Sequence, residues 1–284
     1  MMNHNILIIG AGSLGTSLYK VLKMKSSGHL KLVGHKAKSD LREQLFVEDD
    51  YSDRLEIINI DEFEIIMIAV QDDKIKSAAK EIAHFDLKGK TIFHLSGSRA
   101  ADELKVLSEE GAFIAALHPL QTFPGLFCET DVWSNIIWSF QGDEQAYPVA
   151  QEITKILSGK LLKLDARQKL ALHVAGVFAA NYLVGLLSLA ETVLEKASVT
   201  NVSANELLFP LVQGVVTNYK TAPAKDILSG PLKRGDAEII RKHLQFLIDT
   251  DGPLDNYKSL AQVILANKDF QIKNREILKD LINI

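Results

Sequence analysis

Apolar runs alternate with polar, helix-forming stretches along the first half of the chain. This alternation is typical of a parallel sheet that is covered by helices on both faces. We therefore expect a doubly wound α/β domain there, with a helix over residues 144–158 before the last strand. The predicted strands are Asn5–Ile9, Leu30–Val33, Ile65–Val70, Thr91–Leu95, Phe113–Leu117, Ile136–Phe140 and Lys160–Leu164.

After Asp165 the strand pattern stops and the periodicity becomes helical. One long helix is expected from Ala166 to about Ala197, and shorter helices follow it. Breaks between them are predicted where turn-forming residues gather, at Asn201–Ser203, Ser229–Pro231 and Asp251–Pro253. The pattern predicts an α/β domain over residues 1–165 and an all-α domain over residues 166–284, with a substrate cleft between them.

The long helix contains an unusually apolar segment. Leu170–Ala190 holds no Lys, Arg, Asp or Glu and is long enough to span a bilayer. His173, Gly176, Asn181 and Gly185 interrupt it, however, and no second apolar span follows. We therefore expect a helix that is buried on all sides, with a membrane span as the alternative.

Composition and charge narrow the class of partner. The 284 residues are 47% hydrophobic and 24% charged, which is typical of a globular protein large enough for two domains. A net charge of -4 offers no broad basic surface, so a nucleic-acid partner is not indicated and a small molecule is. The single cysteine, Cys128, cannot form an internal disulfide, and no signal-peptide pattern precedes the first strand. These features predict a cytoplasmic protein.

A glycine-rich motif connects the first strand to the first helix. Gly10, Gly12 and Gly15 form a GxGxxG pattern, and the helix-forming stretch Thr16–Lys23 follows it. In this context the glycines allow a tight turn, close approach of a pyrophosphate and close helix–strand packing. The motif predicts a Rossmann dinucleotide site, the alternative being a glycine-rich turn without a ligand. The predicted contacts are Gly10, Ala11, Gly12, Ser13, Leu14 and Gly15.

The choice of cofactor is read after the second strand. His35, Lys36 and Lys38 stand where NAD enzymes place an acid for the ribose hydroxyl, and basic groups suit a 2′-phosphate. NADP is therefore favoured, although Asp40 leaves NAD open.

Another predicted strand ends in Val70-Gln71-Asp72-Asp73, at the sheet edge where ligands bind. Val70 and Gln71 are predicted to contact the cofactor, and Asp72 or Asp73 is expected to cap the helix that follows.

Candidate chemistry gathers after two further strands. Ser96 and Ser98 can donate hydrogen bonds to a substrate or cofactor, and His118 is the leading proton carrier, since a histidine titrates near neutral pH. The alternative for His118 is a role in supporting the turn fixed by Pro119, and His94 is expected to be structural because it lies within a strand.

Polar residues of the helical half complete the candidate set. His173 and Asn181 are polar exceptions on an apolar helix and can line one side of the cleft, where each side chain is expected to bond either to a ligand or to the protein itself. Lys233 or Arg234 is a candidate for binding a substrate carboxylate, the alternative being an exposed basic turn, and Asp236 is expected to cap the next helix. No spacing typical of metal ligands occurs, so no metal is predicted.

These motifs together resemble a Rossmann-like, NADP-oxidoreductase-type family with a C-terminal domain of unknown function (DUF2520-like). The resemblance is carried by Gly10–Gly15, Val70–Asp73, His94–Ser98, His118–Phe123, Ser229–Pro231 and Arg234–Asp236. Its wider kin are ketopantoate reductase, pyrroline-5-carboxylate reductase and the β-hydroxyacid dehydrogenases. The resemblance implies a helical domain like the C-terminal domain of 6-phosphogluconate dehydrogenase, and a homodimer.

The same resemblance bears on the mechanism. β-Hydroxyacid dehydrogenases use a lysine four residues before an asparagine on the long helix, but Val177 stands at that distance from Asn181. The pair of a serine with His118-Pro119 is instead similar to prephenate dehydrogenases, whose histidine takes a proton from the substrate hydroxyl. The sequence therefore predicts an NADP-dependent oxidoreductase acting on a small, carboxylate-bearing carbonyl, alcohol or imine. The alternative is a non-catalytic dinucleotide sensor or scaffold.

Overall fold

A computed structural model describes residues 2–35 and 50–283. The chain forms two compact units, Met1–Ala180 and Asn181–Ile284. The first unit extends beyond the domain boundary predicted at residue 165 and includes helix α5 (Ala166–Ala179). Lys36, Lys38 and Asp40, which bear on the prediction of NADP, lie outside the described residues.

The first unit is built on a sheet of eight strands in the described residues, in the order β3-β2-β1-β4-β5-β6-β7-β8. Neighbouring strands are parallel except for β6 and β7, which pair antiparallel. The seven predicted strands are confirmed to within two residues. The strands are β1 (Ile6–Ile9), β2 (Leu30–Val33), β3 (Tyr51–Ser52), β4 (Ile65–Ile68), β5 (Thr91–His94), β6 (Phe113–Pro119), β7 (Ile137–Gly142) and β8 (Lys160–Lys163).

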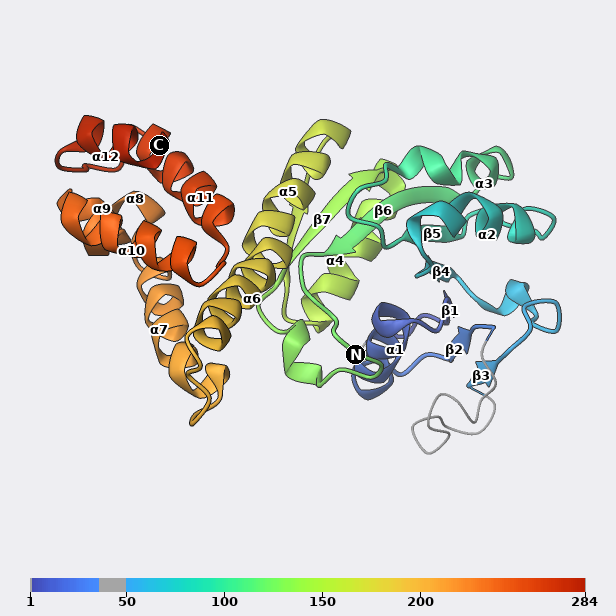
Figure 1. Ribbon diagram of the computed structural model, residues 1–284. Helices are drawn as coiled ribbons and strands as arrows, with labels where there is room; N and C mark the ends of the chain where they lie inside the picture. Colours follow the sequence, from blue (N-terminus) through green and yellow to red (C-terminus); the bar gives the residue numbers. More distant parts are fainter. Residues whose placement is uncertain (1, 36–49, 284) are drawn as a thin grey trace. The chain divides into compact units, whose positions relative to one another are not determined.

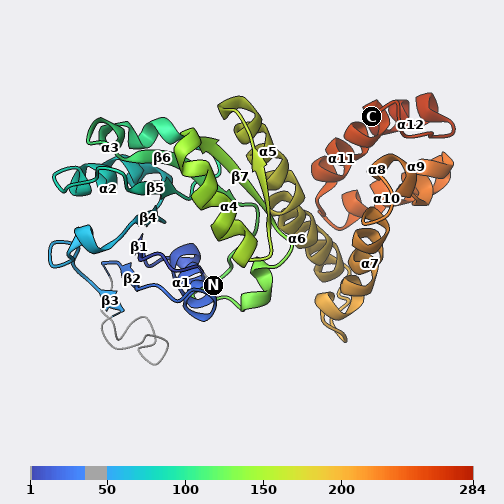
Figure 2. The same cartoon turned by 180° about the vertical axis from the view of Figure 1, so that it is seen from behind.

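Helices cover both faces of this sheet (Figure 1; Figure 2 from behind). Ile6 and Ile8 of β1 pack into one core with residues of α1 and α4, whereas Leu7 and Ile9 pack into a second core with α2 and α3. This alternation confirms the predicted doubly wound Rossmann arrangement. The α-helices are α1 (Ser13–Lys25), α2 (Ile75–Ile82), α3 (Lys105–Glu109), α4 (Tyr147–Ile156) and α5, and the short 3-10 helices are η3 (Ile60–Glu62), η4 (Asp72–Lys74), η5 (Ala101–Leu104), η6 (Thr130–Trp133) and η7 (Glu144–Ala146).

The second unit is all-helical, as predicted. Its core gathers buried residues of three helices, among them Ile240, Leu265 and Leu278. The carboxylate of Asp236 accepts a hydrogen bond from the backbone N–H of Ile239 and caps the next helix, which confirms that prediction. The helices are α6 (Asn181–Lys196), α7 (Ala204–Tyr219), α8 (Ala224–Ile227), α9 (Gly230–Arg234), α10 (Ala237–Asp249), α11 (Leu254–Ala266) and α12 (Arg275–Asn283).

The single long helix predicted from Ala166 to Ala197 is wrong in two respects. It is divided at Ala180, where φ of -118° departs from the helical value, into α5 and α6. It is also not buried on all sides, because among the described residues α5 buries only Lys169 and α6 buries none. Residues 166–196 are long and apolar enough to cross a membrane, but 0% of that apolar window is buried inside the chain.

Candidate functional site

The glycine turn after β1 is shaped for close approach of a ligand. Gly10 has a φ of +118°, and a Cβ there would overlap the carbonyl oxygen of Ala69. A Cβ on Gly15 would overlap the carbonyl oxygen of Gly10. Next to Gly12, by contrast, the described residues leave open space on the side where a Cβ would point. The turn is therefore tight against the sheet at two glycines and open at the third.

The N-terminus of α1 begins at this turn. Gly12 occupies the N-cap position, no side chain in the described chain caps it, and the first turn holds no acidic residue. The first backbone N–H groups of a helix have no partner within the helix, and together they favour an anion. Gly12 and α1 thus fit a diphosphate.

A cavity of about 400 Å³ adjoins the turn. Five residues predicted to contact the cofactor line it, namely Gly10, Ala11, His35, Val70 and Gln71. The remaining lining residues were not predicted to contact the cofactor, and they come from the ends of β1 and β2, from loops, from η4 and from α2. These are Ile9, Val33, Gly34, Leu55, Lys74, Ser77, Ala78 and Glu81.

Polar side chains converge farther along the carboxyl edge of the sheet. Asp72 follows β4, and its carboxylate accepts a hydrogen bond from the Ser98 hydroxyl at 2.5 Å. The prediction that Asp72 or Asp73 caps a helix is wrong, because neither η4 nor α2 has a side-chain cap in the described structure. Burial alone would raise the pKa of Asp72, but hydrogen bonds from Ser98 and Ser96 and the positive charge of Arg99 lower it on balance.

The turn from Ser96 to Ser98 is held by its own groups. The Ser96 hydroxyl oxygen accepts hydrogen bonds from the backbone N–H groups of Ser98 at 3.2 Å and Arg99 at 3.1 Å. His94 supports the turn from within β5. Its Nε2 lies 2.9 Å from the carbonyl oxygen of Ala100, and its Nδ1 accepts from the backbone N–H of Ser96. Burial lowers the pKa of His94 to about 4, so the ring is neutral and both nitrogens are used.

His118, on β6, has one ring nitrogen left for chemistry. Its Nδ1 lies 3.0 Å from the carbonyl oxygen of Leu95 and must donate, because a carbonyl only accepts. Nε2 is then an acceptor. Burial lowers the pKa of His118 to about 4, and the ring is therefore neutral near pH 7.

His118 and His173 face each other across Gly97. Their ring centroids are 6.1 Å apart, with the rings edge to face. A Cβ on Gly97 would lie 2.8 Å from Nε2 of His118 and 2.5 Å from Nδ1 of His173. Only glycine lets the two imidazoles approach this turn so closely.

Lys169 is a further candidate residue, which the sequence analysis did not predict. It lies on α5, is 2% exposed, and donates a hydrogen bond from Nζ to the carbonyl oxygen of Ser96 at 2.5 Å. Burial lowers the pKa of its ammonium to about 8, while the negative charge of Asp72 opposes that shift. Val177 stands four residues before Asn181, where the resemblance would place a lysine, whereas Lys169 stands four residues before His173 and therefore on the same face of the helix.

Two family models match the chain. Residues 2–119 match the Rossmann-like domain, and residues 136–264 match the domain of unknown function DUF2520. The chain joins a Rossmann-like domain to a DUF2520 domain. The predicted resemblance is confirmed. The two matched segments together contain the polar cluster described above, namely Asp72, His94, Ser96, Ser98, His118, Lys169 and His173. No curated protein matches the chain.

Several solved structures share the fold of this Rossmann-like and DUF2520 chain. A "putative NADP oxidoreductase" from Bacteroides fragilis is 23% identical, with a TM-score of 0.77 over 92% of this chain and 98% of that one. A reductive aminase from Aspergillus terreus in complex with NADPH and ethyl levulinate is 16% identical, with a TM-score of 0.67 over 98% and 99%. An imine reductase from Myxococcus stipitatus, a variant in complex with NAD+, is 14% identical, with a TM-score of 0.63 over 99% and 100%. At these identities the likeness shows the fold.

The predicted site residues divide between the two units. Ser96, Ser98, His118 and His173 come together in the first unit, as the contacts above describe. Asn181, Lys233 and Arg234 belong to the second unit, where Asn181 is the exposed first residue of α6. No group of three or more side chains suited to a metal occurs among the described residues.

The predicted basic turn of the second unit is a short helix, α9, which ends at Gly235 in the left-handed conformation. Lys233 lines a polar cavity of about 540 Å³ there, together with Lys225, Asp226, Lys268, Asp269 and Gln271. Because this cavity mixes both signs of charge, it does not single out an anion.

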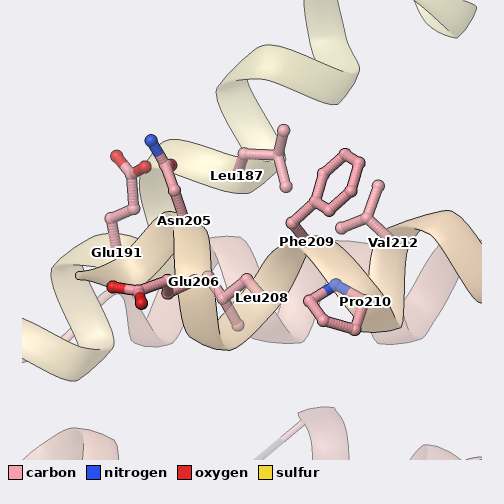
Figure 3. Close-up of a pocket in the computed structure, with 8 residues that line it drawn as sticks. All are labelled: Leu187, Glu191, Asn205, Glu206, Leu208, Phe209, Pro210 and Val212. Carbon is pink, nitrogen blue, oxygen red and sulfur yellow. The ribbon is translucent and has the colours of Figure 1, made fainter. Parts of the chain in front are cut away.

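A further hollow of the second unit is a groove between α6 and α7 (Figure 3). It measures about 530 Å³, and Leu187, Phe209 and Val212 gather toward one end while the carboxylates of Glu191 and Glu206 lie toward the other. Its remaining lining residues are Asn205, Leu208 and Pro210. The groove is therefore largely apolar, with its two carboxylates at one end.

Proposed function

We propose that this chain is an NADP-dependent oxidoreductase that transfers hydride to or from a small, carboxylate-bearing carbonyl, alcohol or imine substrate. One observation carries the proposal. Lys169, His118 and His173 surround the Ser96–Ser98 turn at the carboxyl edge of the same sheet whose first strand ends in the open glycine turn.

The residues around the glycine turn fit a dinucleotide. Gly12 and the uncapped N-terminus of α1 would hold the diphosphate, and the adjacent cavity would take the adenosine half. His35 and Lys74 line that cavity and supply basic groups for a 2′-phosphate, which supports NADP over NAD. When bound, the nicotinamide supplies or accepts the hydride.

The side chains of the cluster handle the proton that accompanies the hydride. In the reduction of an imine, the hydride goes to the substrate carbon and Lys169 donates a proton to the nitrogen, since its ammonium is largely protonated near pH 7. In a carbonyl–alcohol couple, Nε2 of His118 accepts the hydroxyl proton during oxidation and returns it to the carbonyl oxygen during reduction, because both directions pass through one transition state. His173 and the Ser98 hydroxyl add polar groups that orient the substrate. Imines and carbonyl compounds thus use different groups of one cluster.

Imine reduction remains among the reactions because relatives with this fold are named imine reductase and reductive aminase. An imine requires a proton at nitrogen rather than at oxygen, and Lys169 can supply it. Asn181, Lys233 and Arg234 stay candidates for substrate contact from the second unit.

The apolar helices of the second unit support a cytoplasmic homodimer. On α7, six large apolar residues are exposed in the single chain, namely Leu207, Phe209, Leu211, Val215, Val216 and Tyr219. Monomeric soluble proteins rarely expose so large an apolar surface, and a second copy would cover it without a bilayer.

Two measurements test the proposal. Calorimetry should detect binding of NADPH more strongly than of NADH, and a panel of 2-oxo acids, hydroxy acids and cyclic imines should show oxidation of NADPH or reduction of NADP with at least one member. His118→Asn should lower turnover of a hydroxy acid by about 10²–10⁴-fold and leave NADPH binding intact. A dinucleotide sensor would bind NADPH with equal affinity in wild type and in the His118→Asn variant, and neither protein would turn over a substrate. That result would overturn the proposal.

A further inference from the structure

Two adjacent carboxylates at the end of β4 have different partners. Asp72 accepts the hydrogen bond from the Ser98 hydroxyl, whereas Asp73 lies 3.5 Å from the ammonium of Lys74. The two side chains therefore differ in what they face, although they share the same sequence context.

A short series of hydrogen bonds connects Asp72 to the buried lysine. The carboxylate of Asp72 holds the Ser98 side chain, at one end of the Ser96–Ser98 turn. The carbonyl oxygen of Ser96, at the other end, accepts the hydrogen bond from Lys169. The turn between them is closed by the Ser96 hydroxyl, which accepts from the backbone N–H of Ser98. Asp72 thus holds in place the Ser96–Ser98 turn, to which Lys169 is hydrogen-bonded.

The surroundings of Lys169 make Asp72 electrostatically important. The titratable groups near this lysine are His94 of β5, His118 of β6 and His173 of α5, and the first two are neutral near pH 7. Arg99, beyond the turn, interacts with Asp72 and with Glu103. Among the described residues, Asp72 is the carboxylate whose charge acts on Lys169. A buried ammonium without a nearby negative charge is strongly disfavoured.

We propose that Asp72 is a positioning residue that keeps Lys169 protonated and holds the Ser96–Ser98 turn in place, so that the ammonium can donate its proton to substrate. The donation step rests on the proposed function, whereas the effect of Asp72 on the charge of Lys169 does not. The direction of the shift agrees, because burial lowers the pKa of Lys169 and the Asp72 carboxylate raises it.

Four substitutions separate charge from geometry. Asp72→Asn removes the charge but leaves an amide oxygen that can still accept from Ser98. Ser98→Ala removes the hydrogen bond and keeps the carboxylate. Asp73→Asn is the matched control, since it removes the neighbouring charge. Asp72→Glu restores the charge and should restore the wild-type behaviour.

The first readout is the titration of Lys169 in the full-length protein, followed by NMR with lysine labelled at Cε and assigned by its loss in Lys169→Met. Lys169 should titrate at lower pH in Asp72→Asn, and at an unchanged pH in Asp73→Asn and Asp72→Glu. The second readout is the pH profile of imine reduction. At pH 8, Asp72→Asn should lower kcat by roughly 3–10-fold, because one unit of pKa is a tenfold change in the protonated fraction above the pKa.

An unchanged titration of Lys169 in Asp72→Asn would overturn the inference, and so would an equal shift in Asp73→Asn. Lys169 could titrate at lower pH in Asp72→Asn, as expected, while no form of the protein, wild type included, turns over any substrate. The proposed function then fails, but the effect of Asp72 on the charge of Lys169 is supported. If wild type reduces an imine substrate and Asp72→Asn has the same pH profile, the positioning role fails and the oxidoreductase stands.

Discussion

The two compact units differ in how much of their apolar surface is buried within the chain. In the sheet unit, successive residues of β1 enter two separate cores, and helices cover both faces. In the helical unit, α10, α11 and α12 form one small core, whereas α6 and α7 contribute no buried residue in the described chain. The sheet unit buries its strands within the chain and holds the polar cluster, although its last helix, α5, leaves Leu170, Val174 and Phe178 exposed. An apolar pattern in the helical unit therefore does not by itself indicate burial within the chain.

The largest effect expected in the sheet unit comes from Lys169→Met. It removes the buried ammonium, and turnover in imine reduction should fall by about 10²–10⁴-fold, the range typical of a positioned acid. Binding of NADPH, measured by calorimetry, should be unchanged.

Lys163→Met is the control for this change, because Lys163 lies exposed on β8 and pairs with Glu144 instead. Equal turnover in the Lys169→Met form and wild type would remove Lys169 from the mechanism.

The next effect tests whether α7 is covered by a second copy. Leu211 is 69% exposed in the single chain, and Leu211→Glu would place a charge in an apolar interface. The dissociation constant of the dimer should rise by on the order of 10²-fold.

Analytical ultracentrifugation measures this change. Ile57→Glu is the matched control, since Ile57 is 62% exposed in the sheet unit, and it should leave the assembly as it is. A wild-type protein that sediments as a monomer at all concentrations would contradict the comparison between the units.

A smaller effect is expected from Gly97→Ala. The added Cβ would meet His118 and His173 at 2.8 and 2.5 Å, and both rings must move. We expect kcat to fall by roughly 10-fold or more, because a displaced catalytic group loses its geometry.

Gly125→Ala provides the comparison, because the described structure leaves open space beside Gly125. Steady-state kinetics of both variants, with melting temperatures, would separate a local displacement from a loss of folding. An active Gly97→Ala protein would show that the two imidazoles need not approach the turn.

The smallest effect concerns stability at acidic pH. His94 and His118 stay neutral in the folded protein down to about pH 4, whereas histidines in an unfolded chain gain a proton near pH 6.5. The unfolded chain then binds more protons in this interval, so the free energy of unfolding falls as the pH decreases from about 6.5 to about 4.

Denaturant unfolding across this range measures how steeply the free energy of unfolding changes with pH. His94→Asn and His118→Asn should each make that dependence less steep. His84→Asn, at an exposed position, should leave the pH dependence of wild type unchanged.

The fold was largely predictable, because its strands are buried and their apolar runs are separated by turn signals. β3 was missed since it has only two residues, Tyr51 and Ser52, and pairs at the edge through β2. The Ser229–Asp236 segment contains Gly, Pro and Ser and was read as a turn, yet it forms the short helix α9 because Pro231 can stand in a first helical turn.

The candidate site was only partly predictable. Ser96, Ser98 and His118 follow predicted strand ends, so their proximity could be expected from a parallel sheet. The contact of Lys169 with Ser96 joins residues far apart in the sequence, and a lysine near an apolar helix carries no signal of burial by itself. The pairing of Asp72 with Ser98 depends likewise on side-chain directions at two loop ends.

The placement of α5 has a consequence for how such proteins can recombine. Lys169 and His173 belong by sequence to the DUF2520 segment, yet by contacts they belong to the sheet unit. Asp72, Ser96 and His118 come from the Rossmann-like segment. A gene fusion that divided the chain at the border of the two segments would leave each half with only part of this cluster. The cluster is therefore whole only in a chain that carries both segments.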